Sequence, residues 1–276
     1  MTRGAPFILT LACLAMTPAM PVVAADAVLL HAAGSLRAPL AEIVQAFEDR
    51  SGIRVKATFG ASGLLLDRIV GGERAEVFAS ANMQHPLTLS RAGRSGPVVS
   101  FARNRLCALA RPDLDVTTES VVERMLDPGV KLGTSTPKAD PSDDYAWEVF
   151  RKVDALEPGS FPILEGKALQ LTGGPASPPP PTDRSIYVAA IERGDADLFL
   201  TYCTNARQAA ALIPGARIVE LPEQVAVEAD YGLAVLSSAS AQAHELARFV
   251  LSPAGQAVLS RHGFTAPAMA TEGSKP

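Results

Sequence analysis

The sequence predicts an α/β protein of two lobes, in which each lobe is a mostly parallel sheet flanked by helices and crossover strands join the two. Short apolar strands alternate with segments of helical spacing along most of the chain, a pattern typical of parallel sheets. Proline and glycine are common, at 22 and 21 of 276 residues, and suit many short elements joined by tight turns. A hydrophobic share of 47% and a charged share of 20% are typical of a globular chain.

Residues 1–25 have the pattern of a secretory signal peptide. Arg3 supplies the positive charge, residues 6–19 the apolar stretch, and residues 23–25 a small-residue cleavage site. A membrane anchor is the alternative; it is disfavoured because the apolar stretch is short and interrupted by proline, whereas a spanning helix needs about 20 residues. We therefore expect a periplasmic mature chain that begins near Asp26.

The first block of the mature chain reads as strand, helix, strand, helix, strand. The expected strands are residues 27–31, 53–59 and 76–80, and the expected helices are 36–50 and 64–70. Such a rhythm places the strands in parallel, and ligands of parallel sheets bind where the carboxyl ends of strands meet helix N-termini.

The second block repeats the alternation with an irregular insertion. Strands are expected at 106–110, 131–135, 195–202 and 216–220, with a further strand starting at 163–164, and helices at 121–126, 143–156, 185–193 and 205–212. The proline-rich insertion, residues 172–181, is expected to be a surface loop partly in polyproline II, because proline lacks a donor and fixes φ. A partner-docking role for it stays open.

The last elements are expected to return to the first block. They are an extended segment at 228–235 and helices at 241–251 and 253–262. Residues 26–105 plus 230–276 would then form lobe 1, and residues 106–229 lobe 2. Two lobes linked by crossover strands suit closure on a small ligand.

The three cysteines become two once the signal peptide is removed. Cys107 and Cys203 remain, and cysteines of an exported protein often pair. A bond across 96 residues would stabilise the fold by several kcal/mol in the chain-entropy model, roughly 4–5 kcal/mol. Two buried free thiols are the alternative.

Hydroxyl residues recur where a predicted strand passes into a helix. The pattern occurs at 34–35, 60–63, 141–142, 182–185 and 202–205. Each loop places a hydroxyl beside unpaired backbone N–H groups at the positive end of a helix. Several such loops in one cleft would bind a fully ionised oxyanion, although each alone is also an ordinary helix cap.

Other function classes find little support. A net charge of −4 without a basic cluster argues against nucleic acid as a partner. The chain has no GxSxG, Walker, GxGxxG, CxxC or HExxH motif, so we expect no enzyme, no cofactor and no built-in metal site. A catalytic base could come only from His31 or from the acids at 140–144.

The sequence resembles the periplasmic molybdate-binding proteins of ABC transporters, which have the type II periplasmic binding fold. The resemblance covers the mature chain. It rests on His31–Leu36, Phe59–Ser62, Ala75–Ala81, Phe249–Leu259 and Arg261–Phe264. It implies a monomeric, non-enzymatic receptor that captures molybdate or tungstate and delivers it to an inner-membrane ABC permease.

The resemblance also implies a set of ligand-binding residues. In that family two serines of the first lobe, a backbone N–H of a second-lobe loop, a helix-start amide and a tyrosine hydroxyl hold the oxyanion oxygens, with no direct metal ligand. The matching positions here are Ser35, Ser62, Ser142, Arg184 with Ser185, and Tyr202.

Acids in the second-lobe loop depart from the family pattern. Asp143 and Asp144 stand near the place where a dianion would approach, and one like charge at about 4 Å costs about 4 kcal/mol at an effective dielectric of about 20. The acids could point outward, or Arg37 or Arg184 could offset them. A different oxyanion, a small organic solute or a cationic solute therefore stays open as the ligand.

Overall fold

The computed structural model describes residue 1 and residues 26–175, 177 and 185–267. The predicted signal peptide, the prolines at 178–181 and Arg184 lie outside the described residues. The described strands form one hydrogen-bonded series in the order β2-β1-β3-β9-β4-β7-β5-β6, with β8 added beside β4. This mixed α/β architecture is the one expected from the alternating pattern.

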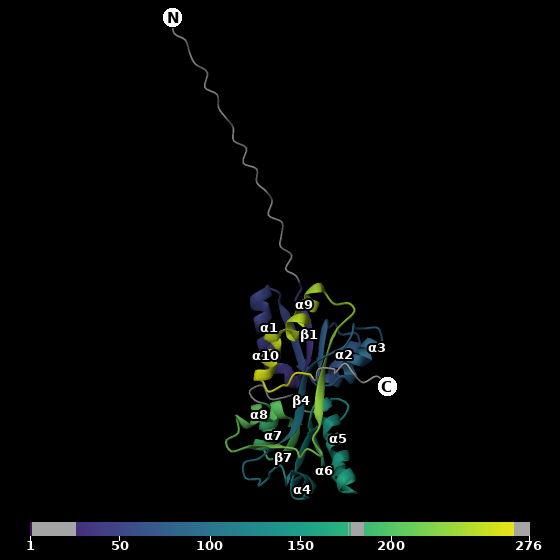
Figure 1. Cartoon of the computed structure of the whole chain (residues 1–276), viewed down its shortest axis with the longest axis vertical. Coiled ribbons are helices and arrows are strands. Elements are labelled where there is room, and N and C mark those ends of the chain that lie inside the picture. The colour runs from purple at the N-terminus through teal and green to yellow at the C-terminus, as the bar shows by residue number, and fades with distance from the viewer. Residues whose placement is uncertain (2–25, 176, 178–184, 268–276) are drawn as a thin grey trace, which may run out of the picture.

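The first region of the molecule surrounds strand β1. Its strands β1 (Val28–Ala33), β2 (Val55–Gly60) and β3 (Val77–Ser80) are parallel, and β9 (Glu228–Val235) pairs antiparallel with β3. Its helices are α1 (Arg37–Ser51), α2 (Ser62–Val70), α3 (Gln84–Arg91), α9 (Ala241–Leu251) and α10 (Pro253–Arg261). Figure 1 shows the C-terminal helices α9 and α10 beside α1, and the three helices are in contact. The end of the described chain therefore returns to its beginning.

The second region contains the middle of the chain. Its strands are β5 (Leu132–Ser135), β6 (Leu169–Thr172), β7 (Leu198–Tyr202) and β8 (Arg217–Glu220). Its helices are α4 (Val121–Leu126), α5 (Pro141–Leu156), α6 (Ser160–Lys167), α7 (Ile186–Glu192) and α8 (Cys203–Ala210). Strand β5 is parallel to both β6 and β7. The division of the chain into two lobes at the expected boundaries stays a prediction.

Strand β4 (Val99–Ala110) runs through both regions, as Figure 1 shows. Its first half pairs with β9 and its second half with β7 and β8, all antiparallel. Apolar residues of the two regions belong to one large buried cluster around these strands. β4 and β9 thus connect the regions as the crossover strands of the prediction would.

One expected element is wrong. Residues 163–164 do not begin a strand but lie inside helix α6. Gly159, at φ 96°, precedes this helix, and Leu164 is fully buried in the core while α6 packs against α5. Helix α3 and the first seven residues of β4 were not expected, and Thr172 ends strand β6 rather than beginning the insertion.

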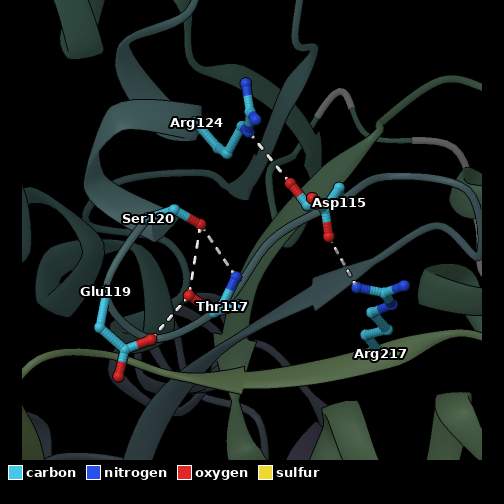
Figure 2. Close-up of polar contacts among 6 residues, drawn as sticks. All are labelled: Asp115, Thr117, Glu119, Ser120, Arg124 and Arg217. Atoms are coloured by element: carbon cyan, nitrogen blue, oxygen red, sulfur yellow. Dashed lines mark hydrogen bonds and ion pairs between the residues drawn. The ribbon is translucent and has the colours of Figure 1, made fainter.

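Polar contacts fix the loop between β4 and α4, at the end of the second region (Figures 1 and 2). Arg217 Nη1 lies 3.3 Å from Asp115 Oδ1, and Arg124 Nε donates to the Asp115 carbonyl at 3.0 Å. The Thr117 N–H donates to Ser120 Oγ at 3.0 Å. The polar groups of this loop thus have their partners within the protein, and the contacts support the structure.

Candidate functional site

A cleft of about 930 Å³ lies between the two regions. Its walls include the ends of β1, β2 and β7 and the starts of α1, α2, α5 and α7. Four sequence-predicted residues line it: Ser35, Ser62, Ser185 and Tyr202. The carboxyl ends of parallel strands and helix N-termini thus meet at this cleft, as expected for a ligand site of an α/β sheet.

Ser35 follows β1 in the short 3-10 turn Gly34–Leu36, and its hydroxyl lies 2.9 Å from the hydroxyl of Tyr231. The Asn104 side chain orients this pair. Its Oδ1 accepts from the Arg105 N–H at 2.9 Å, so its Nδ2 donates to Tyr231 at 3.3 Å. Tyr231 can then donate to Ser35, which leaves the Ser35 proton free for a ligand.

Ser62 begins α2, and its hydroxyl oxygen accepts from the backbone N–H of Ala81 at 3.1 Å. The proton of this hydroxyl is therefore also free for a ligand. Tyr202 is bound differently, because its hydroxyl donates to the Ala81 carbonyl at 3.3 Å. In this structure the Tyr202 proton is already used, and burial raises its pKa well above the usual value.

Ser142 does not line the cleft among the described residues, contrary to the expectation for its backbone N–H. That N–H donates to Asp140 Oδ1 at 3.1 Å, and its hydroxyl lies 3.0 Å from the same oxygen and 2.8 Å from Ser135 Oγ. Asp140 is the N-cap of α5 and itself lines the cleft. A carboxyl group of the chain thus occupies the helix terminus expected to hold the ligand.

The acids that follow Asp140 are placed away from the cleft wall. Asp143 is fully buried, and neither of its oxygens has a hydrogen-bond partner among the described residues. Burial raises the pKa of Asp143 to about 8. Asp144 Oδ1 accepts from the Lys138 N–H at 3.0 Å. Asp140 is therefore the acid at the cleft, whereas the sequence analysis had placed Asp143 and Asp144 near the ligand.

The second-region wall contains further polar groups that sequence reasoning missed. Ser185 Oγ accepts from the Tyr187 N–H at 3.3 Å and so caps α7. Asn205 Nδ2 donates to the Tyr187 hydroxyl at 3.0 Å. Tyr187, Asn205 and Gln208 line the cleft; Asn205 stands in one of the loops the sequence had marked. Expected site residue Arg184 lies outside the described residues.

On the first-region side the cleft has one cationic residue in its described lining. Arg37, the first residue of α1, is exposed and lies with its guanidinium 4.8 Å from the centre of the Phe59 ring. This stacking directs the side chain along the cleft wall. Arg37 can offset negative charge in the cleft.

A direct backbone contact links the two regions beside the cleft. The Gly63 N–H, in the first turn of α2, donates to the Ala139 carbonyl at 2.9 Å. A Cβ at Gly63 would lie 2.4 Å from the Lys138 carbonyl oxygen and 2.7 Å from that of Ala139. Lys138 itself has φ 65°, the left-handed conformation. Glycine at 63 is therefore required for this contact.

Cys107 and Cys203 form a disulfide within the second region. Cys107 lies in β4 and Cys203 begins α8, directly after Tyr202. The bond therefore ties the start of α8, directly after Tyr202 at the end of β7, to the strand that crosses between the regions.

Neither a metal centre nor a histidine base is found at the cleft. Within the described residues, no group of three or more His, Cys, Asp or Glu side chains could hold a metal ion. His31 is buried in β1, with Nε2 2.9 Å from Glu73 Oε1, and is not among the cleft-lining residues.

The fold and the hydroxyl-lined cleft between two regions are those of a solute-binding component of a transport system. The chain belongs to the bacterial extracellular solute-binding proteins, a family that it matches over residues 28–265. This family consists of non-catalytic, substrate-binding transport components of the ABC type. No helix in the described part of the chain is long and apolar enough to cross a membrane.

Two curated relatives cover most of the chain. It is 35% identical to the uncharacterized protein PM1146 of Pasteurella multocida, over 75% of this chain and 86% of that protein. It is 26% identical to the molybdate-binding protein ModA of Mycobacterium tuberculosis, over 92% of this chain and 90% of that protein.

Solved structures share the fold at lower identity. The periplasmic molybdate-binding protein of Azotobacter vinelandii superposes with a TM-score of 0.69 at 20% identity, covering 87% of this chain and 99% of that chain. The sulfate-binding protein SubI of Mycobacterium tuberculosis superposes with a TM-score of 0.71 at 16% identity, covering 87% of each chain.

Proposed function

We propose that this chain is a periplasmic receptor that captures molybdate or tungstate and delivers the ion to an inner-membrane ABC permease. In this proposal residues 1–25 direct export and are removed, the mature chain acts as a monomer, and it needs no cofactor. The ion binds between the two regions without a bond from any side chain to the metal atom.

The observation that carries this proposal is that the hydroxyl groups of Ser35 and Ser62 line one cleft, where each can offer a proton to a ligand. Each hydroxyl oxygen accepts a hydrogen bond from within the protein or can do so, so its proton is available to an oxyanion oxygen. Both serines lie at or beside the first turn of a helix, where the backbone dipole favours an anion. Donors without a net charge suit a ligand that only accepts hydrogen bonds.

Two relatives with named ligands add support for an oxyanion. The protein from Mycobacterium tuberculosis that matches over 92% of this chain is described as molybdate-binding. The solved structures that share the fold include proteins described as molybdate-binding and sulfate-binding. Molybdate, tungstate and sulfate are all tetrahedral oxyanions.

Calorimetric titration of the purified mature chain tests the proposal. We expect molybdate and tungstate to bind more tightly than sulfate or phosphate, and each bound ion to raise the unfolding temperature because it binds only the folded state. A chain that gives neither heat nor a thermal shift with molybdate and tungstate would not be a receptor for them.

A receptor for a small organic or cationic solute is the second candidate. Asp140 and the 930 Å³ volume favour it, because this volume is within the range of small-molecule sites, about 300–1,000 Å³. A solute with its own hydrogen-bond donor would find an acceptor in the Asp140 carboxyl. Titration with small hydroxy acids, phosphorylated acids and amines, beside the oxyanions, separates the two candidates.

A further inference from the structure

Asp140 is the one acid among the described residues that line the cleft, and Arg37 is the one basic residue. Molybdate and tungstate carry two negative charges and no proton at neutral pH. Because like charges repel in a partly buried site, an ionised carboxylate opposes such a ligand. The cleft must therefore either bind another ligand or change the charge of Asp140 when the oxyanion enters.

The position of the Asp140 carboxyl is built by its surroundings. Oδ1 accepts from the N–H of Ser142 at 3.1 Å and from its hydroxyl at 3.0 Å. The backbone of Gly173, at φ 79°, passes close by, and a Cβ there would lie 2.8 Å from Oδ2. Ser142 thus holds the carboxyl group at the cleft wall, and the absence of a side chain at Gly173 leaves space for it.

The groups around Asp140 shift its pKa in opposite directions. Burial raises the pKa of Asp140, and the charge of Asp144 raises it further, while the hydrogen bonds from Ser142 lower it. Tyr187 in α7 and Tyr202 in β7 line the cleft with Asp140; burial raises the pKa of both hydroxyls, and the charge of Asp140 adds to the increase.

Two more charged groups complete these surroundings. Asp143 lies in the first turn of the helix that Asp140 caps; burial raises the pKa of Asp143, and the charge of Asp140 raises it further. Arg37 lies on the opposite wall of the cleft.

Resting on the proposed oxyanion receptor, we propose that the Asp140 carboxyl and the bound oxyanion share one proton. A fully ionised dianion entering the cleft draws a proton from solvent onto an Asp140 oxygen, and the new O–H donates a hydrogen bond to the ligand. One O–H bond forms, no bond of the oxyanion breaks, and the net charge of the occupied cleft rises by one. Asp140 is then a specificity-determining residue.

Proton uptake makes binding depend on pH in a defined way. When binding consumes one proton, the association constant falls about tenfold for each unit of pH rise above the pKa of Asp140 in the empty cleft. Below that pKa the carboxyl is already protonated, and the affinity levels off. An oxyanion held by neutral donors alone would bind with the same affinity throughout this range.

The experiment is calorimetric titration of the mature chain with sodium molybdate between about pH 5 and pH 9, in pairs of buffers with different ionisation heats. The difference in heat between the two buffers of a pair gives the number of protons taken up. Asp140→Asn removes the titrating group and keeps a good helix N-cap, so the fold is expected to persist, as its thermal unfolding will report. Glu148→Gln, a change at a half-buried position on the same helix that is not among the cleft-lining residues, is the control.

We expect uptake to approach one proton per ion in the wild type and in Glu148→Gln, and none in Asp140→Asn. Asp140→Asn should also bind molybdate with an affinity that is flat with pH. If molybdate binds without proton uptake at every pH tested, the shared proton is overturned, while the proposed receptor function is not. Failure of the folded wild type to bind molybdate, tungstate or sulfate overturns both. Uptake that persists in Asp140→Asn overturns the assignment to this residue.

Discussion

The two sides of the cleft use the same local pattern in opposite ways. On the first-region side, the Ser62 oxygen accepts from the Ala81 N–H and the Ser35 oxygen can accept from Tyr231, so both hydroxyls can donate a proton to a ligand. On the second-region side, Ser142 contributes its N–H and hydroxyl to Asp140, and the carboxyl faces the cleft. A serine at a helix start is therefore a ligand donor only when its own hydrogen bonds leave a proton free.

The two regions also differ in how they are stabilised. The largest effect on stability that we expect comes from this difference. In the described chain the disulfide Cys107–Cys203 lies wholly in the second region. Replacing both cysteines by serine should lower the free energy of unfolding by about 4–5 kcal/mol, because a loop of 96 residues is no longer closed in the unfolded chain. Denaturant unfolding of the double variant measures this loss.

Reduction of the wild type offers an independent check of the same bond. Unfolding with and without a thiol reductant should differ by the amount seen between wild type and double variant. If reduction leaves the unfolding midpoint unchanged, the disulfide is either absent in solution or without effect on the second region.

Asp143, buried in the second region, gives the next largest effect. Its pKa of about 8 in the folded chain lies above the unfolded value of about 3.9. Between these values the folded state holds a proton that the unfolded state has lost, so this group's contribution to stability falls as pH rises. Asp143→Asn should remove that loss, so the stability of the variant relative to wild type should increase by several kcal/mol between about pH 4 and about pH 8.

The measurement is the difference in unfolding free energy between Asp143→Asn and wild type at several pH values. This difference should grow in favour of the variant from about pH 4 to about pH 8. Glu148→Gln, a change at a half-buried position on the same helix, should show no such growth. A constant difference would mean that Asp143 has an ordinary pKa.

Much of the fold could be predicted from the sequence because apolar residues recur along it with the spacing of a helix or of a strand. Helices α4 (Val121–Leu126) and α9 (Ala241–Leu251) have the predicted bounds. Helix α6 was mistaken for a strand, because a short apolar run such as Ile163–Leu164 fits either structure and packing against α5 decides. Strand β4 extends past its apolar half because partners on both sides supply its hydrogen bonds.

Only part of the candidate site could be predicted from the sequence. The resemblance to the molybdate-binding family pointed to Ser35, Ser62 and Tyr202, and these three residues do line the cleft, although their binding of a ligand stays a prediction. The resemblance could not show that Asp140 caps its own helix, since that depends on a side-chain rotamer. The role of Gly63 was equally hidden, because its carbonyl partner comes from a loop in the other region.

The contact between the regions at Gly63 predicts a smaller effect. In Gly63→Ala the new Cβ would meet two carbonyl oxygens at 2.4 and 2.7 Å, so the regions must separate there. We expect ligand binding to weaken by about 2 kcal/mol, close to thirtyfold, because closing the cleft now costs strain. Gly166→Ala in α6, with no atom within 4 Å of the new Cβ, is the matched control.

Solution scattering distinguishes the cause of such weakening. The ligand-free variant should have a larger radius of gyration than the wild type if the regions have moved apart. Weak binding at an unchanged radius would place the defect in the local hydrogen bonds of α2 instead.

The smallest expected effects compare one serine from each side of the cleft. Ser35→Ala removes a free proton donor and should weaken oxyanion binding by about 1–2 kcal/mol. Ser142→Ala removes a hydroxyl that is bound internally, so it should lower the unfolding free energy by about 1 kcal/mol and should not weaken ligand binding, because no proton donor is taken from the ligand. Titration and thermal unfolding of both variants separate the two effects. Should Ser142→Ala weaken binding more than Ser35→Ala does, the second side of the cleft rather than the first provides the main donor, and the contrast between the sides is reversed.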